Sequence, residues 1–362
     1  MNIIFIFIYL IASLLVFLFY HRAFGIFSSK KLFYSWLVCT TIFFSVRFLD
    51  NIISDTLLKW LSYFSGIWMF FIYYSILFFI LKVLIDLVKS LITGKISITN
   101  GTLLAKICCF VIVSGIIYGS YEAYTPIVRT EEIKTKKITE PLNIIFVSDI
   151  HSGNILGKEF VAKLVNQINT LNPDFVLIGG DIIDHGYEVV ARQNSLLPLK
   201  NISVTYGTIA VLGNHDYLTH HEDLLTKELT KLGLTVLINK KIERANITFV
   251  GLKDYSKDSS LESLQDLYDI ENKNYKVLLD HQPHRISAAA KSGYDLYLAG
   301  HTHSGAFFPN QLLTTFFNDM NYGRQSFENL VAIVTSGYGF FGIPIRINAQ
   351  PEIVLIKLIP DN

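Results

Sequence analysis

The chain has 362 residues, of which 51% are hydrophobic, 14% aromatic and only 17% charged. This composition is too apolar for one soluble globule, so it predicts that part of the chain lies in lipid. A net charge of +1 offers no basic surface, and we expect no nucleic-acid partner. The three cysteines, Cys39, Cys108 and Cys109, all fall in the first third of the chain. The remainder can therefore form neither a disulfide nor a thiolate metal site.

The first 125 residues predict a membrane anchor of about four helices. Segment 2–20 carries no charge over roughly the length that a helix needs to cross a hydrocarbon core of about 30 Å. A cleaved signal peptide is the less favoured alternative, because no Lys or Arg precedes the segment and no small-x-small site follows it. The stretch 83–95 contains Asp86 and Lys89, and we expect it either to lie along the membrane surface or to extend the third helix. The four predicted helices are 2–20, 32–49, 60–81 and 105–124.

Lysine and arginine counts between these helices indicate the orientation of the anchor. The first and third loops carry more basic residues than the second, so the positive-inside bias places those two loops in the cytoplasm. Both termini, and with them the C-terminal domain, are then extracytoplasmic. The basic residues after the fourth helix oppose this orientation, and a count of three helices would reverse it. The residues counted are Arg22, Lys30 and Lys31 in the first loop, Arg47 and Lys59 in the second, Lys82, Lys89, Lys95 and Lys106 in the third, and Arg129, Lys134, Lys136 and Lys137 after the fourth helix.

Residues 126–141 are predicted to be a polar linker, and residues 142–362 an α/β domain. Eight short runs rich in Val, Ile and Leu are typical of strands that are covered on both faces. Amphipathic helices are expected between some of them, at 158–171 and 222–233. The pattern therefore predicts a largely buried sheet flanked by helices. The runs lie at 143–149, 174–181, 207–216, 247–254, 275–281, 295–301, 331–337 and 352–358.

Most of these runs end in polar side chains. In α/β sheets the crevice outside the carboxyl ends of the strands is where ligands bind, so these side chains are expected to converge. Any one of the histidines alone would more often be an ordinary strand-end residue, and Asn214 alone would be a turn former. Clusters at five strand ends favour a shared site. The clusters are Asp149 and His151, Asp181 and Asp184, Asn214 to Asp216, His281, and His301 with His303.

In order along the chain these clusters read D-I-H at 149–151, G-D-I-I-D at 180–184, G-N-H-D at 213–216, a lone His281 and G-H-T-H at 300–303. The set closely resembles the calcineurin-like metallophosphoesterase superfamily over roughly residues 142–358. The segment TSGYGFFGIPIRINAQPEIVLIKL is similar to the membrane-anchored phosphodiesterase branch of that family. The resemblance implies a metallophosphoesterase fold, an αββα sandwich of two mixed sheets flanked by helices.

The resemblance also implies a site for two divalent metal ions bridged by Asp181. One ion would take Asp149, His151 and His303, and the other Asn214, His281 and His301. Ligation by nitrogen and oxygen without thiolate suits Mn, Fe or Zn. His215 corresponds to the histidine that assists the leaving group or steadies the phosphoryl oxygens, and Asp184 and Asp216 correspond to carboxylates that orient ligands or that histidine.

Several residues keep two interpretations. Arg346 is expected either to bind a substrate phosphate or to form a structural salt bridge. Asp254 is equally expected to face the site or not. The aromatic segment 307–323 follows a departure from the family pattern at Ser304, and is expected either to form an apolar lip for an acyl or prenyl chain or to pack against the anchor. Four histidines outside the motifs are expected at the surface or the rim: His185, His220, His221 and His284.

These expectations describe a membrane-anchored, dimetal-dependent phosphodiesterase or phosphatase that uses a hydroxide between the two metals. Its expected partners are the lipid bilayer and a phosphorylated substrate, either lipid-linked or a cell-envelope phosphate. The alternatives are a tethered enzyme for soluble nucleotides or phosphoproteins, and a non-catalytic metal-binding sensor. The oligomeric state is left open.

Overall fold

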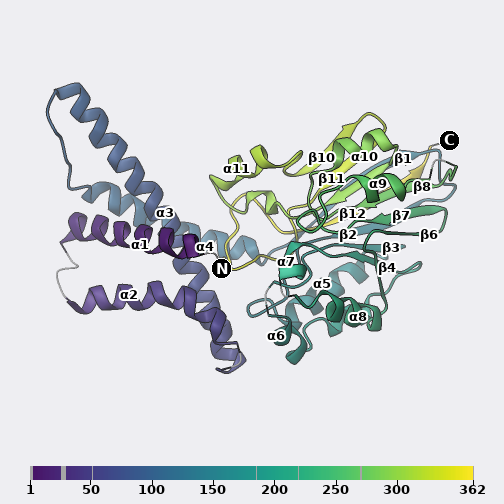
Figure 1. The fold of residues 1–362 in the computed structure, drawn as a ribbon, viewed down its shortest axis with the longest axis horizontal. Helices are drawn as coiled ribbons and strands as arrows, with labels where there is room; N and C mark the ends of the chain where they lie inside the picture. The colour runs from purple at the N-terminus through teal and green to yellow at the C-terminus, as the bar shows by residue number, and fades with distance from the viewer. Residues whose placement is uncertain are drawn as a thin grey trace. The chain divides into compact units, whose positions relative to one another are not determined.

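The computed structural model describes residues 3–25, 30–50, 52–184, 186–218, 220–269 and 271–361. The chain divides into two compact units (Figure 1). The first holds residues 1–120 with 342–345, and the second holds residues 121–341 with 346–362.

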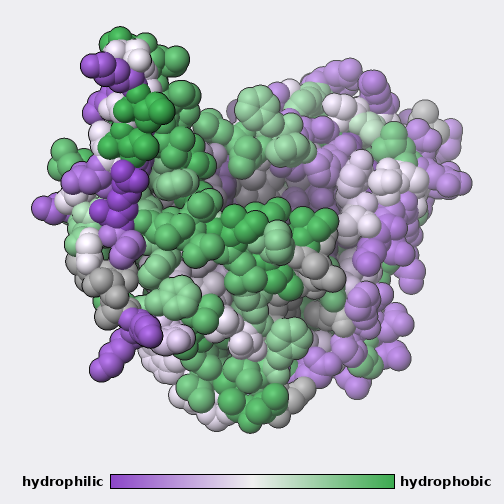
Figure 2. All heavy atoms as spheres, turned by 60° about the vertical axis from the view of Figure 1, so that its left-hand side comes forward, coloured by the Kyte–Doolittle hydropathy of each residue, from purple (hydrophilic) through white to green (hydrophobic). Residues whose placement is uncertain are grey.

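The first unit is built from four helices and a short 3-10 turn. Side chains from three helices meet at Tyr20, whose hydroxyl lies 3.1 Å from Ser75 Oγ and 3.2 Å from Cys108 Sγ. Figure 2 shows hydrophobic residues gathered over the face on which these helices lie. The elements are α1 (Ile3–Phe24), α2 (Lys30–Ser45), η2 (Val46–Phe48), α3 (Asp55–Thr93) and α4 (Thr102–Ala123).

Three of these helices, Ile4–Phe24, Asp55–Thr93 and Thr102–Ala123, are long and apolar enough to cross a membrane. The expected second span, 32–49, is represented by α2, which has only 16 residues. The expected third span, 60–81, is part of a helix of 39 residues. The stretch 83–95 therefore extends that helix, because the Lys82 ammonium pairs with the Asp86 carboxylate one turn later and both side chains are buried.

The second unit contains two six-stranded sheets, both mixed. The first has the order β1-β12-β2-β3-β4-β5, and the second has the order β10-β11-β9-β8-β7-β6. All eight apolar runs form strands. The strands are β1 (Ile127–Thr135), β2 (Leu142–Val147), β3 (Phe175–Gly179), β4 (Thr208–Val211), β5 (Leu234–Val236), β6 (Lys240–Arg244), β7 (Ile247–Gly251), β8 (Tyr275–Leu279), β9 (Leu296–Ala299), β10 (Gly323–Phe327), β11 (Leu330–Val334) and β12 (Glu352–Pro360).

Helices cover the outer face of each sheet, which confirms the predicted αββα sandwich (Figure 1). Val161 and Leu164 of α5 pack on the first sheet, and Ile286 of α10 packs on the second. Between the sheets, Phe146 and Phe249 belong to one shared buried cluster. The helices are α5 (Lys158–Thr170), α6 (Tyr187–Arg192), α7 (Asn214–Leu218), α8 (Glu222–Lys231), α9 (Glu262–Asp266), α10 (Ile286–Ser292) and α11 (Asn310–Phe317), with 3-10 turns η3 (Leu197–Asn201) and η4 (His303–Gly305).

Residues 126–141, expected as a linker, instead contribute strand β1, which pairs in parallel with β12 from Ile127↔Glu352 to Thr135↔Pro360. The strand lies at the edge of its sheet and has several exposed positions, so its sequence is polar and lacks the apolar run of an interior strand. Arg129 fixes it in place: its Nε and Nη2 atoms donate to the buried Glu352 carboxylate at 2.9 and 3.0 Å.

We expect Arg129→Ala to lower the free energy of unfolding by about 3 kcal/mol, because it leaves the buried Glu352 carboxylate without its charge partner. Denaturant unfolding of the full chain in detergent would measure the loss. Lys134→Ala, at an exposed position of the same strand, is the matched control and should change little. Equal stabilities of the two variants would contradict a structural role for β1.

Candidate metal centre

The five motif clusters lie together because the strands that precede them end at one edge of the sandwich. In the register of the two sheets, Val147 of β2 lies opposite Ile178 of β3, and Leu279 of β8 lies opposite Leu298 of β9. The loops beyond these strands are also joined: Asp149 N donates to Gly180 O at 2.9 Å. Short apolar strands thus end in aligned loops that carry the ligand candidates.

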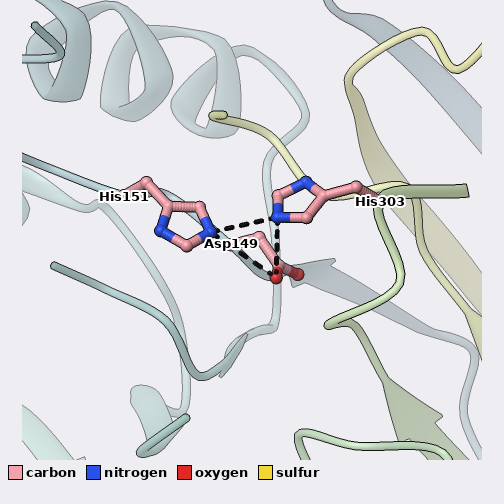
Figure 3. Close-up of side chains that lie close together, drawn as sticks. All are labelled: Asp149, His151 and His303. Carbon is pink, nitrogen blue, oxygen red and sulfur yellow. Dashed lines mark hydrogen bonds and ion pairs between the residues drawn. The ribbon is translucent and has the colours of Figure 1, made fainter. Parts of the chain in front are cut away.

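The first group of candidate ligands is Asp149, His151 and His303 (Figure 3). Nε2 atoms of the two histidines lie 3.0 Å apart, and His303 Nε2 lies 3.5 Å from the Asp149 carboxylate. All three side chains are buried. Figure 3 shows the two rings turning these nitrogens toward the carboxylate. Each ring therefore turns one nitrogen that could bind a metal ion toward the same small space.

The second group is Asp181, His281 and His301, with Asn214 beside them. His281 Nδ1 lies 2.8 Å from the Gly179 carbonyl oxygen, which can only accept, so that nitrogen carries a proton. Its Nε2 faces the site, 3.2 Å from Asp181 Oδ2 and 3.2 Å from Asn214 Oδ1. The backbone thus fixes which nitrogen of His281 is turned to a metal.

Asp181 lies between the two groups. Its Oδ2 is 3.7 Å from His151 Nε2 and 3.2 Å from His281 Nε2, while its Oδ1 accepts the backbone N–H of His215 at 2.8 Å. One buried carboxylate therefore faces ligand nitrogens from both groups, as a bridging ligand requires.

Electrostatics favour metal-binding protonation states in the first group. Burial lowers the pKa of His151 to about 3, and burial with the nearby charge of Arg346 lowers the pKa of His303 well below its usual value. Burial also raises the pKa of Asp149 to about 6, although the charge of His281 opposes this. Neutral imidazoles are the form that binds metals, and a nearby cation would offset the cost of burying the ionised carboxylate.

In the second group the balance differs. Burial alone would lower the pKa of His281, but the charge and hydrogen bond of Asp181 outweigh burial and raise it well above its usual value. The pKa of Asp181 is correspondingly lowered, because the charges of His281, His151 and His215 outweigh its own burial. The ion pair of His281 and Asp181 places positive charge where a metal ion would carry it.

The backbone is strained at most of the candidate ligands. Five of them adopt positive φ angles, a region that residues other than glycine enter at a cost of order 1–3 kcal/mol each. Such strain persists only where the surrounding fold imposes it, and it gathers at functional sites. The residues and their φ angles are Asp149 (55°), His151 (49°), Asp181 (50°), His301 (70°) and His303 (49°).

His215 faces the same space, with its ring 4.8 Å from that of His151. Burial opposes its protonation, but Asp184, whose Oδ1 lies 3.2 Å from His215 Nδ1, and the charge of Asp181 raise its pKa to about 9. Asp184 therefore orients this histidine. Asp216 instead accepts the backbone N–H groups of Gly213 and Ile183 at 2.8 and 2.9 Å. Its carboxylate fastens the two loops that carry Asp181 and Asn214.

Arg346 is buried, so it is not placed to bind a substrate phosphate, the first of the two interpretations given for it. The second interpretation, a salt bridge, is not formed with any residue that the structure describes. Among the described residues, its guanidinium donates to the carbonyl oxygens of Ser336, Gly339 and Ala349. Its Nη2 also lies 2.6 Å from His303 Nδ1. Arg346 thus holds the ring of a candidate ligand in place.

Asp254 is buried and accepts both hydrogen bonds of the Gln282 amide at 3.0 Å, so it supports the loop of His281 from behind. His220 is exposed, whereas His221 and His284 are partly buried. His221 Nε2 lies 3.5 Å from Glu188, and the His284 ring lies 4.7 Å from that of Tyr255. His185 lies outside the described residues.

Phe341 belongs to the site although no sequence motif marked it. Its ring lies 5.1 Å from that of His215, 5.5 Å from His303 and 5.6 Å from His151, and the residue is 48% exposed. It forms an apolar wall beside the polar cluster. The only signal in the sequence is the glycine- and aromatic-rich segment that contains it.

The residues present fit a pair of divalent metal ions. The ligand atoms of each group lie within 4.8 Å of one another, and a third group of the same kind, His151, Asp181 and His215, connects the two. Nearly all of these side chains are buried, where carboxylates and imidazoles turned toward one another need a cation to offset their desolvation. Nitrogen and oxygen donors of this kind suit Mn, Fe or Zn.

Comparisons with known proteins show which proteins this chain is similar to. A family model described as calcineurin-like phosphoesterase matches residues 142–305. An uncharacterized metallophosphoesterase of Helicobacter pylori is 36% identical over 251 residues, which cover 67% of this chain and 67% of that protein. A transmembrane protein with a metallophosphoesterase domain from Danio rerio is 29% identical over 330 residues, covering 84% of this chain and 75% of that protein. Among solved structures, a dimetal phosphatase from Danio rerio has a TM-score of 0.40 at 14% identity, over 57% of this chain and 89% of that one.

We expect Asp181→Asn to lose about half or more of the bound metal, because it removes the one carboxylate that faces both ligand groups. Elemental analysis of the purified full chain, dialysed after loading with Mn²⁺, would measure the loss. Asp223→Asn on α8 replaces an exposed aspartate and should keep the wild-type content. Unchanged metal content in Asp181→Asn would rule out a bridging role.

Proposed function

Because this chain belongs to the calcineurin-like metallophosphoesterase family and is a phosphoester hydrolase, we propose that it is a membrane-anchored, dimetal-dependent enzyme acting on a lipid-linked or cell-envelope phosphate. The observation that carries this proposal is the pair of ligand groups joined at Asp181 with His215 beside them. Two divalent ions, when bound, would acidify a water molecule and neutralise charge on the phosphoryl oxygens.

The proposed ligands follow the two groups. Asp149, His151 and His303 would hold one ion, and Asn214, His281 and His301 the other, with Asp181 shared. The loops that carry them are fastened by buried hydrogen bonds: His301 N donates to both oxygens of Asp149 at 3.1 Å. A rigid backbone keeps the ligand atoms converging, which is how a protein fixes coordination geometry before substrate binds.

His215 is the proposed general acid. Its Nδ1 lies 3.2 Å from Asp184 Oδ1, and its ring lies 4.8 Å from that of His151, so the imidazole is oriented within reach of a phosphate held at the candidate ligands. Burial opposes protonation of His215, but Asp184 and the charge of Asp181 raise its pKa, which favours a ring that can give a proton to the departing oxygen. The Asp184 carboxylate stabilises the imidazolium and sets its direction, as a second residue behind a catalytic histidine does.

A lipid-linked substrate is supported by the apolar surroundings of the site. Phe341 forms one wall beside the three histidines. The segment after the last ligand contributes Phe308, Phe316 and Phe317, all exposed. Exposed aromatic groups next to a polar metal cluster suit a ligand that has a phosphate at one end and a hydrocarbon chain at the other.

We further propose that α2 crosses the membrane with the other three helices, although it has only 16 residues. It lies antiparallel to α1 along most of that helix: Phe33 packs edge-on against Phe17, the Thr40 and Ser13 hydroxyls are hydrogen-bonded, and Phe43 stacks on Tyr9. Its length of about 24 Å is slightly shorter than a hydrocarbon core, a mismatch that bilayers accommodate by thinning. With four crossings, the positive-inside bias makes the catalytic domain extracytoplasmic.

We expect His215→Asn to lower kcat about 10²- to 10⁴-fold for chromogenic phosphodiesters and monoesters, because it removes the proton donor while leaving the metal ligands intact. The measurement is hydrolysis of bis-p-nitrophenyl phosphate and p-nitrophenyl phosphate by the full chain in detergent with Mn²⁺. The preferred ester would also narrow the substrate class.

The matched control is His220→Asn, which replaces an exposed histidine outside the motifs and should leave kcat unchanged. A wild-type protein that holds its metals but hydrolyses neither ester, nor the phosphate of phospholipid vesicles, would contradict the proposed function. It would favour a metal-binding sensor.

Topology reporters test the orientation of the domain. With four crossings, we expect alkaline phosphatase fused after the last residue to be active, and green fluorescent protein at the same place to be dark, because both report an extracytoplasmic end. Fusions after Lys95, in the predicted cytoplasmic third loop, should give the opposite pattern. Bright fluorescence from the C-terminal fusion would mean that α2 does not cross.

A further inference from the structure

Helix α11 carries its hydrophobic face outward. Leu312, Leu313, Phe316 and Phe317 recur at the spacing that places residues on one side of a helix, and Phe316 and Phe317 are 84% and 74% exposed. Gln311 instead turns toward the protein, donating to the carbonyl oxygen of Ile347 at 3.1 Å. The polar side of the helix therefore packs on the fold, and the apolar side is left uncovered by the rest of the described domain, the reverse of an ordinary surface helix.

The helix is fastened close to the metal ligands. Gly305, two residues after His303, packs so tightly on α11 that a Cβ there would lie 2.5 Å from Gln311 Cα. The loop is also closed at its far end, since the Thr302 hydroxyl donates to Asn321 O at 2.6 Å. An apolar helix is thus built rigidly into the loop that carries two candidate metal ligands.

A single residue, Asn348, connects α11 to the C-terminal end of α4 by hydrogen bonds. Asn348 O accepts from the Gln311 amide at 3.4 Å, and Asn348 N donates to the Glu122 carboxylate at 3.3 Å. Glu122 lies in the last turn of α4, and this residue itself belongs to the second unit, which begins at residue 121. The Thr125 carbonyl just beyond is fixed by Gln350 at 2.9 Å. The polar side of α11 is thus connected through Asn348 to Glu122, in the last turn of a helix that is proposed to span the membrane.

We propose that α11 is an interfacial helix that lays Phe308, Leu312, Leu313, Phe316 and Phe317 on the phospholipid bilayer in which the chain is anchored. This inference rests on the proposed function in one respect, namely that α4 spans the membrane. Residues 310–317 carry no charge, so nothing opposes their entry among the acyl chains just below the headgroups. The bilayer is favoured over a second copy of the chain because the connection from α11 through Asn348 to Glu122 leads directly to a spanning helix.

Docking of α11 would bring the metal-ligand loop to the level of the lipid phosphates. A substrate phosphate could then reach the site by diffusion in the plane of the membrane, while its hydrocarbon chain stays in lipid. The substrate class that this arrangement selects is a membrane lipid whose phosphoester lies at the headgroup level.

A fluorescent label tests the proposal without relying on catalysis. Phe316→Cys, in a full-length chain whose Cys39, Cys108 and Cys109 are replaced by Ala, is labelled with an environment-sensitive nitrobenzoxadiazole dye. The protein is placed in phosphatidylcholine–phosphatidylglycerol nanodiscs. We expect phosphatidylcholine spin-labelled near the top of its acyl chain to quench the dye by about half or more, because an interfacial residue lies at that depth.

The matched control carries the label at Leu224→Cys, an exposed leucine on α8 of the same domain, and should be quenched little. Equal, weak quenching at both positions would overturn the proposal, whether the face then covers a second copy or remains in water. Hydrolysis of bis-p-nitrophenyl phosphate by the same samples tests the proposed function separately. Quenching without hydrolysis would refute the function alone, and hydrolysis without quenching would refute the docking alone.

Discussion

The arrangement of the catalytic domain depends on one constraint: carboxylates that are buried away from water must be compensated by neighbouring groups. Asp149 and Asp181 lie at the floor of the site, where an ionised group is stable only beside positive charge or strong donors. His281 forms an ion pair with Asp181, and the backbone N–H of His301 donates a hydrogen bond to the Asp149 carboxylate. These two interactions stabilise the buried carboxylates. Positive φ angles at the ligands are the backbone cost of bringing these groups together.

Much of this domain could be predicted from the sequence because its information is local. An interior strand such as β3 is an apolar run that can be recognised from its own sequence. The motifs that carry the candidate ligands follow such strands within a few residues. The fold and the family followed from that local pattern. The structure then brought Asp149, His151 and His303 within one small space, as the family motifs had implied.

What the sequence did not reveal depends on contacts between distant residues. Strand β1 is polar because it lies at an edge, and only its pairing with β12, more than two hundred residues later, makes it a strand. Arg346 was open to a phosphate-binding or a salt-bridge interpretation because its burial under carbonyl groups has no local signature. The sequence left open whether α3 continues through 83–95, because Lys82 and Asp86 interrupt the hydropathy although they neutralise each other within the helix.

The position of β1 also decides where this domain can be cut from its anchor. Because β12 is an interior strand with mostly buried side chains, a fragment that began at the first motif would leave a row of N–H and C=O groups of β12 open along an apolar edge. Such an edge is a template for pairing with other chains. The smallest piece that avoids self-association and aggregation therefore begins before Ile127, at the end of α4.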